Sequence, residues 1–458
     1  MCGICGQFRF DGEIVSTKSL DDMMSKLAKR GPDSKGKWLE GRIGFGHQRL
    51  SIIDLSNLGS QPMVDDFLKL TLVFNGTIYN YKALRSQLIS NGYVFFSNSD
   101  TEVIIKAYHF WGEDCVNHLD GMFAFAIWDR SSQQLFVARD RMGIKPLYFN
   151  ITSKAFTFAS NSQALLTQKL DKSINPVALH QQLSLHGVVP APNTIINGIQ
   201  KLKPGTFFTL SPNGKLREKT YWQPCAKRLE ENISDQDYIE RTHELLTSAV
   251  MKRMSASDVP IGVLLSGGLD SSLIVALLKE AGHEDIRTFS IGFEDIDDEV
   301  GSEFEYSDQI VSKFKTQHKK YQVSNKEVLP RLSEAVMNMS EPMVGQDAVA
   351  FYLLSEQVSK HTKVVLSGQG ADEAFAGYFW YPRMANEQGN EVERFSKHYV
   401  DRPHDEYLQT VSSIYQGENH THNWLNKEFL KPGADSFIDK VFRTDMTRLI
   451  VDDPVKRV

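Results

Sequence analysis

The chain contains few cysteines and no long apolar run, and both absences restrict its class. Four cysteines among 458 residues are too few for the disulfide framework of a small secreted domain and favour a reducing compartment. No stretch of about 18 apolar residues is present, so the sequence predicts no transmembrane helix. The first residues, MCGICGQFRFDG, lack the apolar core of a secretory signal peptide. We therefore expect a cytoplasmic protein.

An excess of charge of one sign is absent as well. The chain has 51 Lys and Arg residues against 57 Asp and Glu residues, which gives a formal net charge of −6. These charges are spread along the sequence, so neither the basic footprint of a nucleic-acid-binding protein nor a polybasic membrane patch is present. We expect no nucleic-acid partner and no membrane partner.

Three segments with different patterns divide the sequence. Residues 1–210 contain short runs rich in Ile, Val and Phe, separated by Gly and Asn, which predicts antiparallel sheets flanked by helices. Residues 211–236 are polar, contain two prolines and have no sustained period, as is typical of a linker. Helical and strand-like segments alternate over 237–458, which indicates a doubly wound parallel sheet. The length is compatible with two or three domains of about 150 residues.

A glycine-rich turn, SGGLDSS (266–272), follows the apolar strand predicted at 261–265. Adjacent glycines and the start of a helix let backbone N–H groups point at an anion, so the turn predicts a phosphate or pyrophosphate pocket. Asp270 is suited to bind Mg²⁺ beside a triphosphate. The turn has neither the lysine of a P-loop nor the G-x-G-x-x-G pattern. A strand–helix connection without a ligand is the alternative, although an acid and three hydroxyl groups at this strand end argue against it.

A second apolar strand ends in an acidic, glycine-rich turn in KVVLSGQGADEAFAGY (363–378). Ser367 and Gly368 would present backbone groups to a nucleotide. Asp372 would share the Mg²⁺ ion, and Glu373 would support it. The turn therefore strengthens the prediction of a nucleotide site at the carboxyl edge of a parallel sheet.

A third strand edge is predicted in TFSIGF, at Ile291 and Gly292. Its backbone would suit recognition of an adenine ring at the same edge of the sheet. A plain core strand is the alternative for these two residues.

Cys2 follows the initiator methionine directly. Removal of Met1 would leave a thiol and an α-amine on one residue, and the amine could serve as the base for the thiol. A cysteine at this position without any catalytic role is the alternative.

Several ordered motifs mark a resemblance to a known family. The motifs are CGI (2–4), RGPD (30–33), HQRLSIID (47–54), FNGTIYNY (74–81), SDTEV (99–103), DGMFAFAIWD (120–129), ARDRMGIKPLY (138–148), SGGLDSS (266–272) and LSGQGADEAFAGY (366–378). With these motifs the first half resembles the glutamine amidotransferase domain of the N-terminal nucleophile type, and the whole chain resembles the glutamine-hydrolysing asparagine synthetase family. The resemblance implies an N-terminal nucleophile glutaminase αββα sandwich (1–210), followed by a doubly wound parallel ATP-pyrophosphatase-type domain (237–458).

The resemblance assigns roles in glutamine hydrolysis. Cys2 would attack the carboxamide, while the Asn75 side chain and the Gly76 N–H, expected at the turn after the strand LKLTLVF, would form the oxyanion hole. Arg49 would hold the α-carboxylate by a two-pronged contact, and Asp100 would bind the α-ammonium. A surface ion pair is the alternative for the last two residues.

Other residues of this half are assigned by the same resemblance. Ile53 would contribute to glutamine binding. Thr77 replaces the acid that asparagine synthetases usually have in NGEIYN, and we expect activity to be retained. The remaining cysteines are expected to be structural: Cys5, Cys115 and Cys225.

The second half is expected to bind ATP with Mg²⁺ and to activate a carboxylate as an acyl-adenylate with release of pyrophosphate. Ammonia from glutamine would then attack the acyl group, after passing through an apolar internal passage. The resemblance places the acyl-adenylate near Gln369, Asp372 and Glu373, and the metal on Asp270 and Asp372. The expected ATP-binding residues are Leu264, Ser266, Gly267, Gly268, Asp270, Ser271, Ile291, Ser367 and Gly368.

The motifs leave two acceptors open, an acetylated dipeptide and aspartate. Gln369 stands where asparagine synthetases usually have the acid of SGEGxDE. The segments GSEFEYSD (301–308), SEPMVGQDAVAFYLLS (340–355) and VDDPVKRV (451–458) resemble the N-acetylglutaminylglutamine amidotransferase subgroup, which amidates an acetylated Gln–Gln dipeptide used as an osmolyte. We prefer this acceptor over aspartate.

Two further alternatives stay open, a glutaminase with a degenerate synthetase half and a non-catalytic homologue. A β-lactam-synthetase-like ligase is disfavoured, because Cys2 and the oxyanion turn are present. Family members usually continue past DDPVKRV (452–458) with a helical stretch that carries a lysine near the adenylating centre, so we expect a C-terminally shortened chain. The small-molecule partners would be glutamine, ATP and the acceptor, and a homodimer is one expectation for the oligomeric state.

Overall fold

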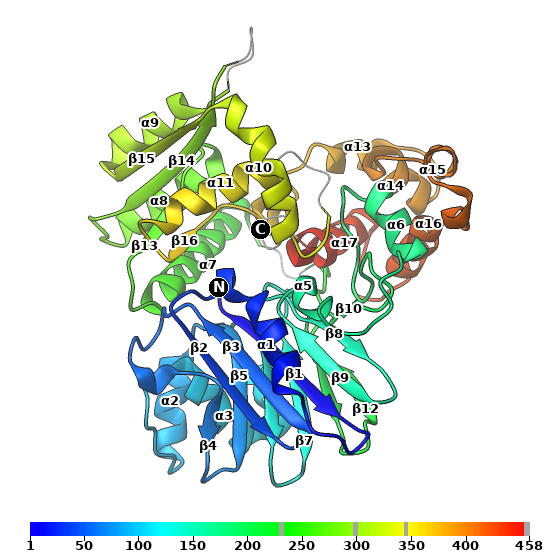
Figure 1. Ribbon diagram of the computed structural model, residues 1–458. Coiled ribbons are helices and arrows are strands. Elements are labelled where there is room, and N and C mark those ends of the chain that lie inside the picture. The colour runs from blue at the N-terminus through cyan, green and yellow to red at the C-terminus, as the bar shows by residue number, and fades with distance from the viewer. Residues whose placement is uncertain (229–232, 296–300, 343–346, 453–458) are drawn as a thin grey trace. The chain divides into compact units, whose positions relative to one another are not determined.

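The chain is described here by a computed structural model that covers residues 1–228, 233–295, 301–342 and 347–452 (Figure 1). It forms two compact units, and each unit combines segments that are distant in the sequence. The first unit contains Met1–Lys227, Ser340–Val344 and Phe379–Arg457. The second unit contains Arg228–Met339 and Gly345–Tyr378.

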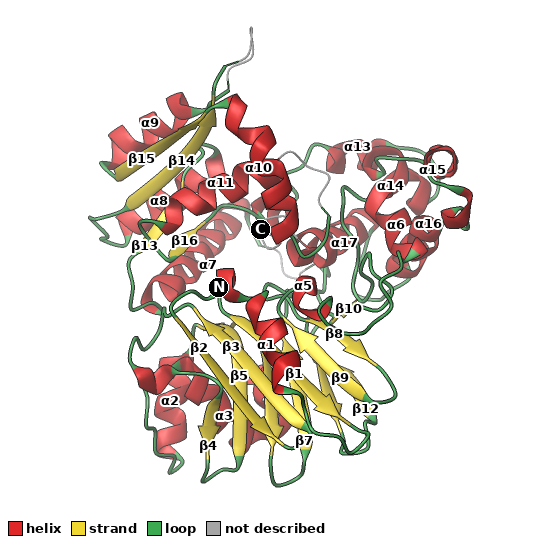
Figure 2. Ribbon diagram, viewed as in Figure 1, coloured by secondary structure: helices red, strands yellow, loops and turns green. Residues whose placement is uncertain are grey.

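Two six-stranded antiparallel sheets face each other in the first unit (Figure 2). Phe8 and Phe45 from one sheet meet Val73 and Trp128 from the other in a buried apolar cluster, the usual way in which two sheets form a core. The prediction of antiparallel sheets is confirmed. In spatial order, one sheet consists of β10 (Gln200–Lys201), β8 (Tyr148–Ile151), β9 (Ala155–Ala159), β1 (Gly3–Arg9), β3 (Ile43–Arg49) and β2 (Ser34–Glu40), and the other of β12 (Leu216–Thr220), β11 (Thr206–Leu210), β7 (Gln134–Arg139), β6 (Gly121–Asp129), β5 (Leu70–Ile78) and β4 (Met63–Asp65).

Helices cover the outer faces of both sheets (Figure 2). Leu20 and Met23 of α1 (Thr17–Ser25) pack on the β1 sheet. Apolar residues of α2 (Tyr81–Ser90) and α3 (Asp100–Trp111) pack on the β5 sheet. This layering is the αββα sandwich that the resemblance implied. Shorter elements of the unit are η1 (Ala28–Arg30), η2 (Asn57–Gly59), η3 (Gly112–Asp114), α4 (Cys115–His118), α5 (Ser162–Leu165) and α6 (Pro176–Ser184).

The segment expected to be a linker, residues 211–236, contains strand β12. This strand pairs with β11 in antiparallel register from Thr206↔Thr220 to Leu210↔Leu216. Most of its side chains are exposed, because an edge strand is held by backbone hydrogen bonds and needs no apolar face. The polar composition therefore hid a strand at this position.

A four-stranded parallel sheet forms the centre of the second unit. Its order is β15 (Gln317–Val323), β14 (Arg287–Phe293), β13 (Ile261–Leu264) and β16 (Val364–Leu366). The chain moves outward from β13 to β15 and then returns to the other side of β13. A topological switch point therefore lies between β13 and β16, and ligands of doubly wound sheets bind at such points.

Helices cover both faces of the parallel sheet. One apolar cluster joins β13 to α7, α8 and α9, and another joins β14 to α11, as the predicted doubly wound fold requires. α8 begins at Leu269, directly after the glycine turn. The helices are α7 (Asp235–Ser255), α8 (Leu269–Glu280), α9 (Phe304–Phe314), α10 (Asn325–Asn338), α11 (Asp347–Ser359) and α12 (Ala371–Phe375).

The C-terminal helices belong to the first unit and include two that contact α6. His180 of α6 is buried, and its ring lies 2.8 Å from Thr421 Oγ1 and 3.0 Å from His404 Nδ1. From the sequence alone, these helices are assigned to the same domain as the parallel sheet, because no change in residue pattern separates them from it. They are α13 (Trp380–Asn386), α14 (Glu391–Tyr399), α15 (His404–Thr410), η4 (Ser413–Tyr415), α16 (His420–Phe429) and α17 (Phe437–Asp452).

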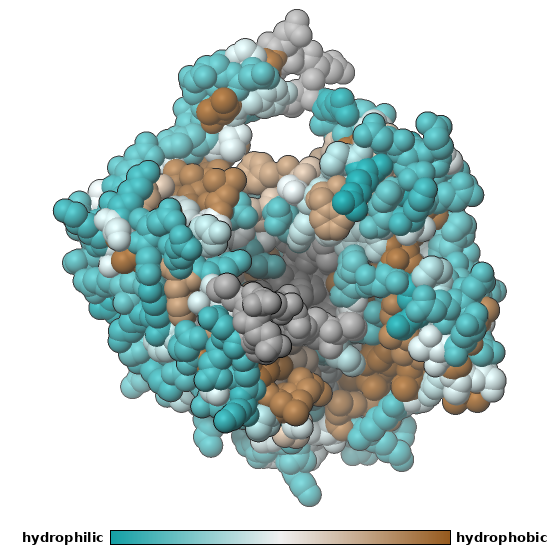
Figure 3. Space-filling model, turned by 90° about the horizontal axis from the view of Figure 1, so that it is seen from above, coloured by the Kyte–Doolittle hydropathy of each residue, from teal (hydrophilic) through white to brown (hydrophobic). Residues whose placement is uncertain are grey.

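The surface drawn in Figure 3 is mostly hydrophilic, and its apolar residues gather in several patches. Within the described ranges, no helix has both the length and the apolar character needed to span a bilayer. The four cysteines are free, and burial raises the pKa of the Cys5 and Cys115 thiols well above the ordinary value. A raised pKa keeps these two thiols protonated at neutral pH, which fits a structural role.

A buried ion pair under the β5 sheet gives a stability prediction. Lys106 Nζ lies 2.5 Å from Asp65 and 3.7 Å from Glu102, and all three side chains are almost fully buried. The substitution Lys106→Met leaves two buried carboxylates without their cation, so we expect the free energy of unfolding to fall by about 3–5 kcal/mol. Urea denaturation measures this loss. Lys37→Met, which removes an exposed pair with Asp21, is the control and changes stability by less than about 1 kcal/mol.

Candidate active sites

Cys2 lies directly before β1, at the end of the sheet where β3 finishes. The β1 register pairs Gly3 with Gln48, so Cys2 comes next to the residues that follow Gln48. The Leu50 N–H donates to Cys2 Sγ at 3.4 Å, and the Arg30 guanidinium donates to the Cys2 carbonyl at 3.1 Å. The thiol is half-buried. The nucleophile predicted from the sequence is thus held in a defined position at one end of the sandwich.

The α-amine of Met1 lies inward beside the same cation, while the residue as a whole is 38% exposed. Burial, and then the charge of Arg30, lower the pKa of this amine to about 5. It is therefore neutral and able to accept a proton at neutral pH. The environment at this chain end favours a base over a charged ammonium group.

Asn75 and Gly76 lie inside β5, and the prediction of a turn at this point is wrong. Asn75 pairs with Ala124 and Gly76 with Phe123 of β6, and the ladder continues to Ile78. The run LKLTLVF ends in sequence where apolar residues end, but the backbone pairing continues through polar residues. A β-carbon on Gly76 would lie 2.2 Å from the Met122 carbonyl oxygen, so only glycine fits there.

The Asn75 side chain is buried without a hydrogen-bond partner. Its exposed fraction is 1%, and neither Oδ1 nor Nδ2 has a partner among the described residues. An unpaired buried amide is costly and rare in a native fold. Strand β5 contacts β1, so this donor lies on the strand that faces the Cys2 strand. The geometry suits an amide that donates a hydrogen bond to an oxygen atom of a bound substrate.

Arg49 is almost fully buried at the end of β3, and its guanidinium already donates to backbone carbonyls. The acceptors are Ser56 at 2.9 Å, Asp54 at 2.5 Å and Ile53 at 3.5 Å. These contacts use three of its five N–H groups, which leaves two for a substrate carboxylate. Among the described residues, Arg49 forms no ion pair with Asp100, so the surface ion pair considered from the sequence is not what the structure contains.

Asp100 is the first residue of α3 and is buried, with 4% exposure. The Ile78 N–H donates to its Oδ2 at 3.0 Å. Burial nevertheless raises the pKa of this carboxyl group to about 7. Because Ile78 closes the strand that carries Asn75 and Gly76, Asp100 lies at the end of the same strand. An ammonium group placed beside it would favour the ionised form.

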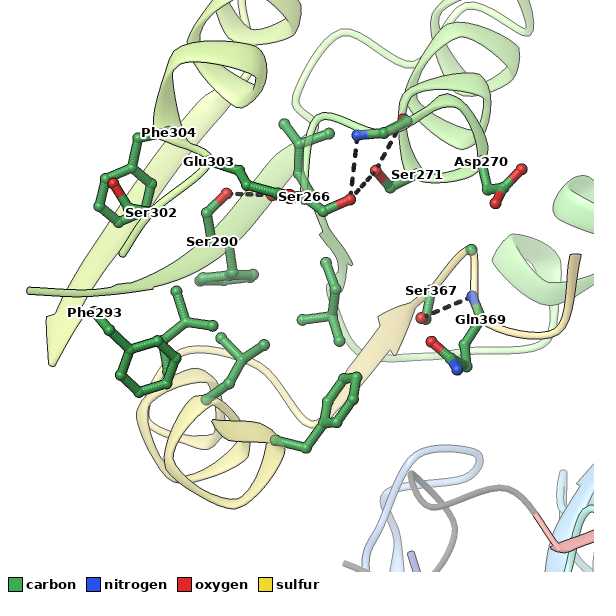
Figure 4. Close-up of a pocket in the computed structure, with 18 of the residues that line it drawn as sticks. Ser266, Asp270, Ser271, Ser290, Phe293, Ser302, Glu303, Phe304, Ser367 and Gln369 are labelled. Carbon is green, nitrogen blue, oxygen red and sulfur yellow. Dashed lines mark hydrogen bonds between the residues drawn. The ribbon is translucent and has the colours of Figure 1, made fainter. Parts of the chain in front are cut away.

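The second unit contains a cavity of about 680 Å³ at the switch point of its sheet (Figure 4). All of the expected ATP-binding residues except Gly267 line it. Of the residues expected near the acyl-adenylate, Gln369 and Asp372 line the cavity, whereas Glu373 does not. Ser290, Phe351 and Tyr378 line it without having been predicted. The full lining is Leu264, Leu265, Ser266, Gly268, Asp270, Ser271, Phe289, Ser290, Ile291, Phe293, Gly301, Ser302, Glu303, Phe304, Phe351, Leu354, Ser367, Gly368, Gln369, Gly370, Asp372 and Tyr378.

Serine hydroxyl groups form hydrogen bonds within the first glycine-rich loop, residues 266–272. Ser266 Oγ lies 3.0 Å from Ser271 Oγ and accepts from the Gly268 N–H at 3.2 Å. Gly267 has φ +93°, and a β-carbon there would lie 2.5 Å from the Ser307 nitrogen. Gly267 therefore packs against Ser307 on the side of the turn away from the cavity, while Ser266 and Gly268 line the cavity. This arrangement places the start of α8 and its N–H groups at the cavity, as expected for a phosphate site.

The second loop lies against the first at Gly368. A β-carbon on Gly368 would lie 2.7 Å from Asp270 Cβ, so the close approach requires glycine. Ser367 Oγ accepts from the Gln369 N–H at 3.2 Å (Figure 4). Glu373 is buried and accepts from the Tyr378 hydroxyl at 2.6 Å, which makes it a supporting residue behind the cavity.

The acidic groups fit a magnesium-bound triphosphate. Burial, and then the charges of Asp372 and Glu373, raise the pKa of Asp270. Such crowding of carboxylates is relieved by a cation, and Mg²⁺ is commonly bound by one or two carboxylates together with phosphate oxygens. The described residues contain no group of three or more His, Cys, Asp or Glu that could hold a metal without a ligand. No Lys or Arg is among the described lining residues.

One wall of the cavity was missed from the sequence. Phe351 and Leu354 belong to α11, which packs on the face of β14. The sequence DAVAFYLLS is apolar on nearly every side of the helix, and that pattern is the one signal that a buried helix lies here. It does not distinguish a core position from a ligand wall.

Comparison with known proteins gives the family. The glutamine amidotransferase domain model matches residues 1–222, and the asparagine synthase model matches residues 241–457. Asparagine synthetase [glutamine-hydrolyzing] 3 of Bacillus subtilis (strain 168) is 35% identical over 452 residues, which cover 95% of this chain and 71% of the relative. The chain therefore belongs to the glutamine-hydrolysing asparagine synthetase family.

Two further similarities concern length and fold. Asparagine synthetase [glutamine-hydrolyzing] 1 of the same strain is 35% identical over 385 residues, and the match spans 83% of this chain and 59% of that relative. Among solved structures, glutamine phosphoribosylpyrophosphate (PRPP) amidotransferase from B. subtilis complexed with ADP and GMP has a TM-score of 0.38 at 14% identity. That match covers 81% of this chain and 91% of the solved chain.

Because the Asn75 amide has no hydrogen-bond partner, we expect its removal to lower the activity of the chain without lowering its stability. We expect Asn75→Ala to lower kcat for glutamate release from glutamine about 10²–10³-fold, because one oxyanion donor is lost. KM changes little, and Tm stays equal or rises, because the variant removes an unsatisfied buried group. Asn91→Ala, at an exposed position after α2, is the control. An unchanged kcat in Asn75→Ala would contradict the role of this amide.

The raised pKa of Asp100 predicts a pH dependence of glutamine binding. In a Cys2→Ala chain, which binds without reacting, the Kd for glutamine should rise about tenfold for each pH unit below 7, because only the ionised carboxylate attracts the ammonium group. Isothermal titration calorimetry measures this slope. Asp100→Asn weakens binding and removes the slope, whereas Asp66→Asn at the surface leaves both unchanged.

The same shift has a consequence for the ligand-free chain. The folded carboxyl group keeps its proton up to about 7, whereas the unfolded group releases it near 3.8. Stability contributed by Asp100 is therefore full at low pH and declines as the pH rises through this window. A Kd for glutamine that is flat from pH 5 to pH 8 would show that Asp100 does not titrate there.

Proposed function

We propose that this chain is an ATP-dependent, glutamine-hydrolysing amidotransferase that converts a carboxylate into a carboxamide. The observation that carries the proposal is the buried, unpartnered amide of Asn75 in the strand facing that of Cys2. The cavity at the switch point, with its glycine loops and paired acids, supports the ATP-dependent half. Membership of the asparagine synthetase family agrees with both halves.

In the glutaminase half, removal of Met1 gives Cys2 the α-amine. The amine accepts the thiol proton, and Sγ attacks the carboxamide carbon to form a tetrahedral oxyanion held by Asn75 and the Gly76 N–H. The protonated amine returns its proton to the departing nitrogen, so ammonia leaves and a thioester forms. Water then hydrolyses the thioester to glutamate. Arg49 and Asp100 orient the two charges of the amino acid.

In the synthetase half, a carboxylate oxygen of the acceptor attacks the α-phosphorus of ATP, and pyrophosphate leaves. Asp270 and Asp372 would hold Mg²⁺, which when bound neutralises phosphate charge and favours this displacement. The Ser266–Ser271 loop and the start of α8 hold the pyrophosphate. Ammonia attacks the acyl carbon, and AMP leaves with the carboxamide formed.

We further propose that the acceptor is N-acetylglutaminylglutamine. The described lining contains Asp270, Asp372 and Glu303 but neither Lys nor Arg. Aspartate brings a second carboxylate that would need a cation, whereas the acetylated dipeptide brings only the carboxylate that reacts. Gln369 lines the cavity with a neutral amide, which can both donate to and accept from peptide groups.

Aspartate is the second candidate acceptor. The similar proteins of Bacillus subtilis are named asparagine synthetases, which favours aspartate. The cytoplasmic location, the homodimer and the absence of nucleic-acid and membrane partners stay predictions, as does the apolar ammonia passage.

An acceptor screen tests the proposed function. The full chain is incubated with ATP, Mg²⁺ and amide-¹⁵N-glutamine, together with either the acetylated Gln–Gln dipeptide or aspartate, and products are measured by mass spectrometry. We expect a ¹⁵N-labelled dipeptide amide and stoichiometric pyrophosphate. In Cys2→Ala, label from glutamine is lost but ¹⁵N-ammonium still labels the product.

The outcomes distinguish a wrong acceptor from a missing ATP-dependent activity. Label on aspartate alone would identify the chain as an asparagine synthetase and overturn the dipeptide acceptor. Glutamate release without pyrophosphate from either acceptor would leave a glutaminase and reject the ATP-dependent half.

A further inference from the structure

A buried lysine, Lys145, lies beside the N-terminal residue of the chain. Its exposed fraction is 5%, and its Nζ donates to Met1 Sδ at 3.0 Å. Lysine is rarely buried to this extent, because its ammonium group is costly to remove from water. The roles assigned to the first unit so far leave this ammonium group unused.

The register of the first sheet brings Lys145 to the end where Cys2 lies. Tyr148 at the start of β8 pairs with Ala159 of β9, and Ala159 pairs with Cys5 of β1. Because β8 and β1 are both antiparallel to β9, they run in the same direction, and the residues that precede them leave the sheet at one end. Lys145 comes three residues before β8, and Cys2 comes directly before β1.

The backbone of Lys145 is fixed at both its N–H and its carbonyl group. The N–H donates to Asp140 Oδ2 at 2.9 Å, and the carbonyl accepts from Arg139 Nε at 2.9 Å. Asp140 also accepts from the Ile144 N–H at 2.9 Å, and Arg139 also donates to the Gly143 carbonyl at 2.6 Å. The loop cannot turn Lys145 out to water without breaking these hydrogen bonds, so the ammonium group stays at the chain end.

Four ionisable groups surround the α-amine of Met1. Burial is the main cause of its lowered pKa, and the charge of Arg30 comes next. The charge of Lys145 lowers the pKa further, whereas Cys2 and Asp33 raise it. Two cations beside one amine make a third positive charge unfavourable where little water is present. The arrangement therefore favours an amine that carries no proton.

Removal of Met1 would place the α-amine on Cys2, within the same group of charges. The Arg30 guanidinium donates to the Cys2 carbonyl at 3.1 Å, so an amine on this residue remains beside that cation. Lys145 would stay at the chain end, because its loop is fixed independently of Met1. Such surroundings suit an amine that has to accept the thiol proton, since a protonated amine cannot act as a base.

We propose that Lys145 is a positioning residue of the glutaminase site, whose buried ammonium group stands beside the N-terminal amine and disfavours a second positive charge there. Lys145 acts through the amine and needs no contact with glutamine. The use of the amine as a base rests on the proposed function, whereas the effect of Lys145 on the amine does not. Without this charge, the amine takes up a proton at higher pH, and glutamine hydrolysis is lost at low pH but kept at high pH.

Competitive acetylation of the full chain with acetic anhydride measures the amine directly. The acetylated N-terminal peptide is quantified by mass spectrometry as a function of pH, and its mass shows whether Met1 or Cys2 carries the amine. We expect Lys145→Met to raise the pH midpoint of acetylation by about one pH unit, because a neighbouring like charge is removed. Lys154→Met, at an exposed position, is the matched control and leaves the midpoint unchanged. An unchanged midpoint in Lys145→Met overturns the proposal.

The pH profile of glutamate release gives the functional measurement. At saturating glutamine, the acid limb of the kcat profile in Lys145→Met should move about one pH unit upward. On this limb kcat then falls about tenfold, whereas at high pH it equals that of the unchanged chain. A loss of kcat by the same factor at every pH overturns the proposal, because Lys145 would then have a structural role alone. If the unchanged chain releases no glutamate, the glutaminase function fails, and the acetylation midpoint still decides the role of Lys145.

Two further variants separate the charge of Lys145 from its packing. Lys145→Arg keeps the positive charge, so we expect the acetylation midpoint and the kcat profile of the unchanged chain. Lys145→Gln removes the charge but keeps a hydrogen-bond donor, and it should shift the midpoint as Lys145→Met does, which gives the same comparison if Lys145→Met does not fold. A shift in Lys145→Arg equal to that in the neutral variants would overturn the proposal, because side-chain shape would then determine the midpoint.

Discussion

Both candidate sites depend on polar groups that are buried before any substrate arrives. Asn75 has no partner for its amide, Asp100 has a pKa near 7 because it is buried, and Asp270 is crowded by two other acids. Each of these states costs free energy in the absence of a ligand. A fold can keep such groups buried and unpaired only if the surrounding backbone is too rigid to move and offer them hydrogen-bond partners.

Central strands and glycine turns supply that rigidity. Asn75 lies in β5, which pairs with β6 through this residue and with β4 at Leu70–Leu72, so the backbone at Asn75 cannot turn to bring the amide to another partner. Asp100 is fixed by the first turn of α3. In the second unit, Gly368 lets one loop lie against Asp270 of the other. The cavity of the second unit therefore lies where strands end and α8 begins, a place that leaves backbone groups available to ligands, whereas Asn75 is held inside a strand.

The sequence predicted the parts of this design that depend on local patterns. Alternating strands and helices predicted the parallel sheet, and SGGLDSS predicted the cavity at its edge. Asn75 and Gly76 were identified, but they were placed in a turn, because backbone pairing to β6 has no signature in side-chain type. For the same reason β12 was hidden in a polar segment. The carbonyl partners of Arg49 and the α11 wall depend on tertiary contacts, which no periodicity encodes.

Charge balance in the nucleotide cavity connects its architecture to the choice of acceptor. A magnesium-bound triphosphate brings a net negative charge into a lining whose described ionisable groups are acids. Each further carboxylate must then be neutralised, either by a cation or by reacting, since an unpaired buried charge is costly. Gln369 contributes a neutral amide to this lining, which adds a donor and an acceptor without charge. Under the proposed function, this charge balance is the reason for proposing an acceptor whose remaining groups are neutral amides over one that keeps a second carboxylate.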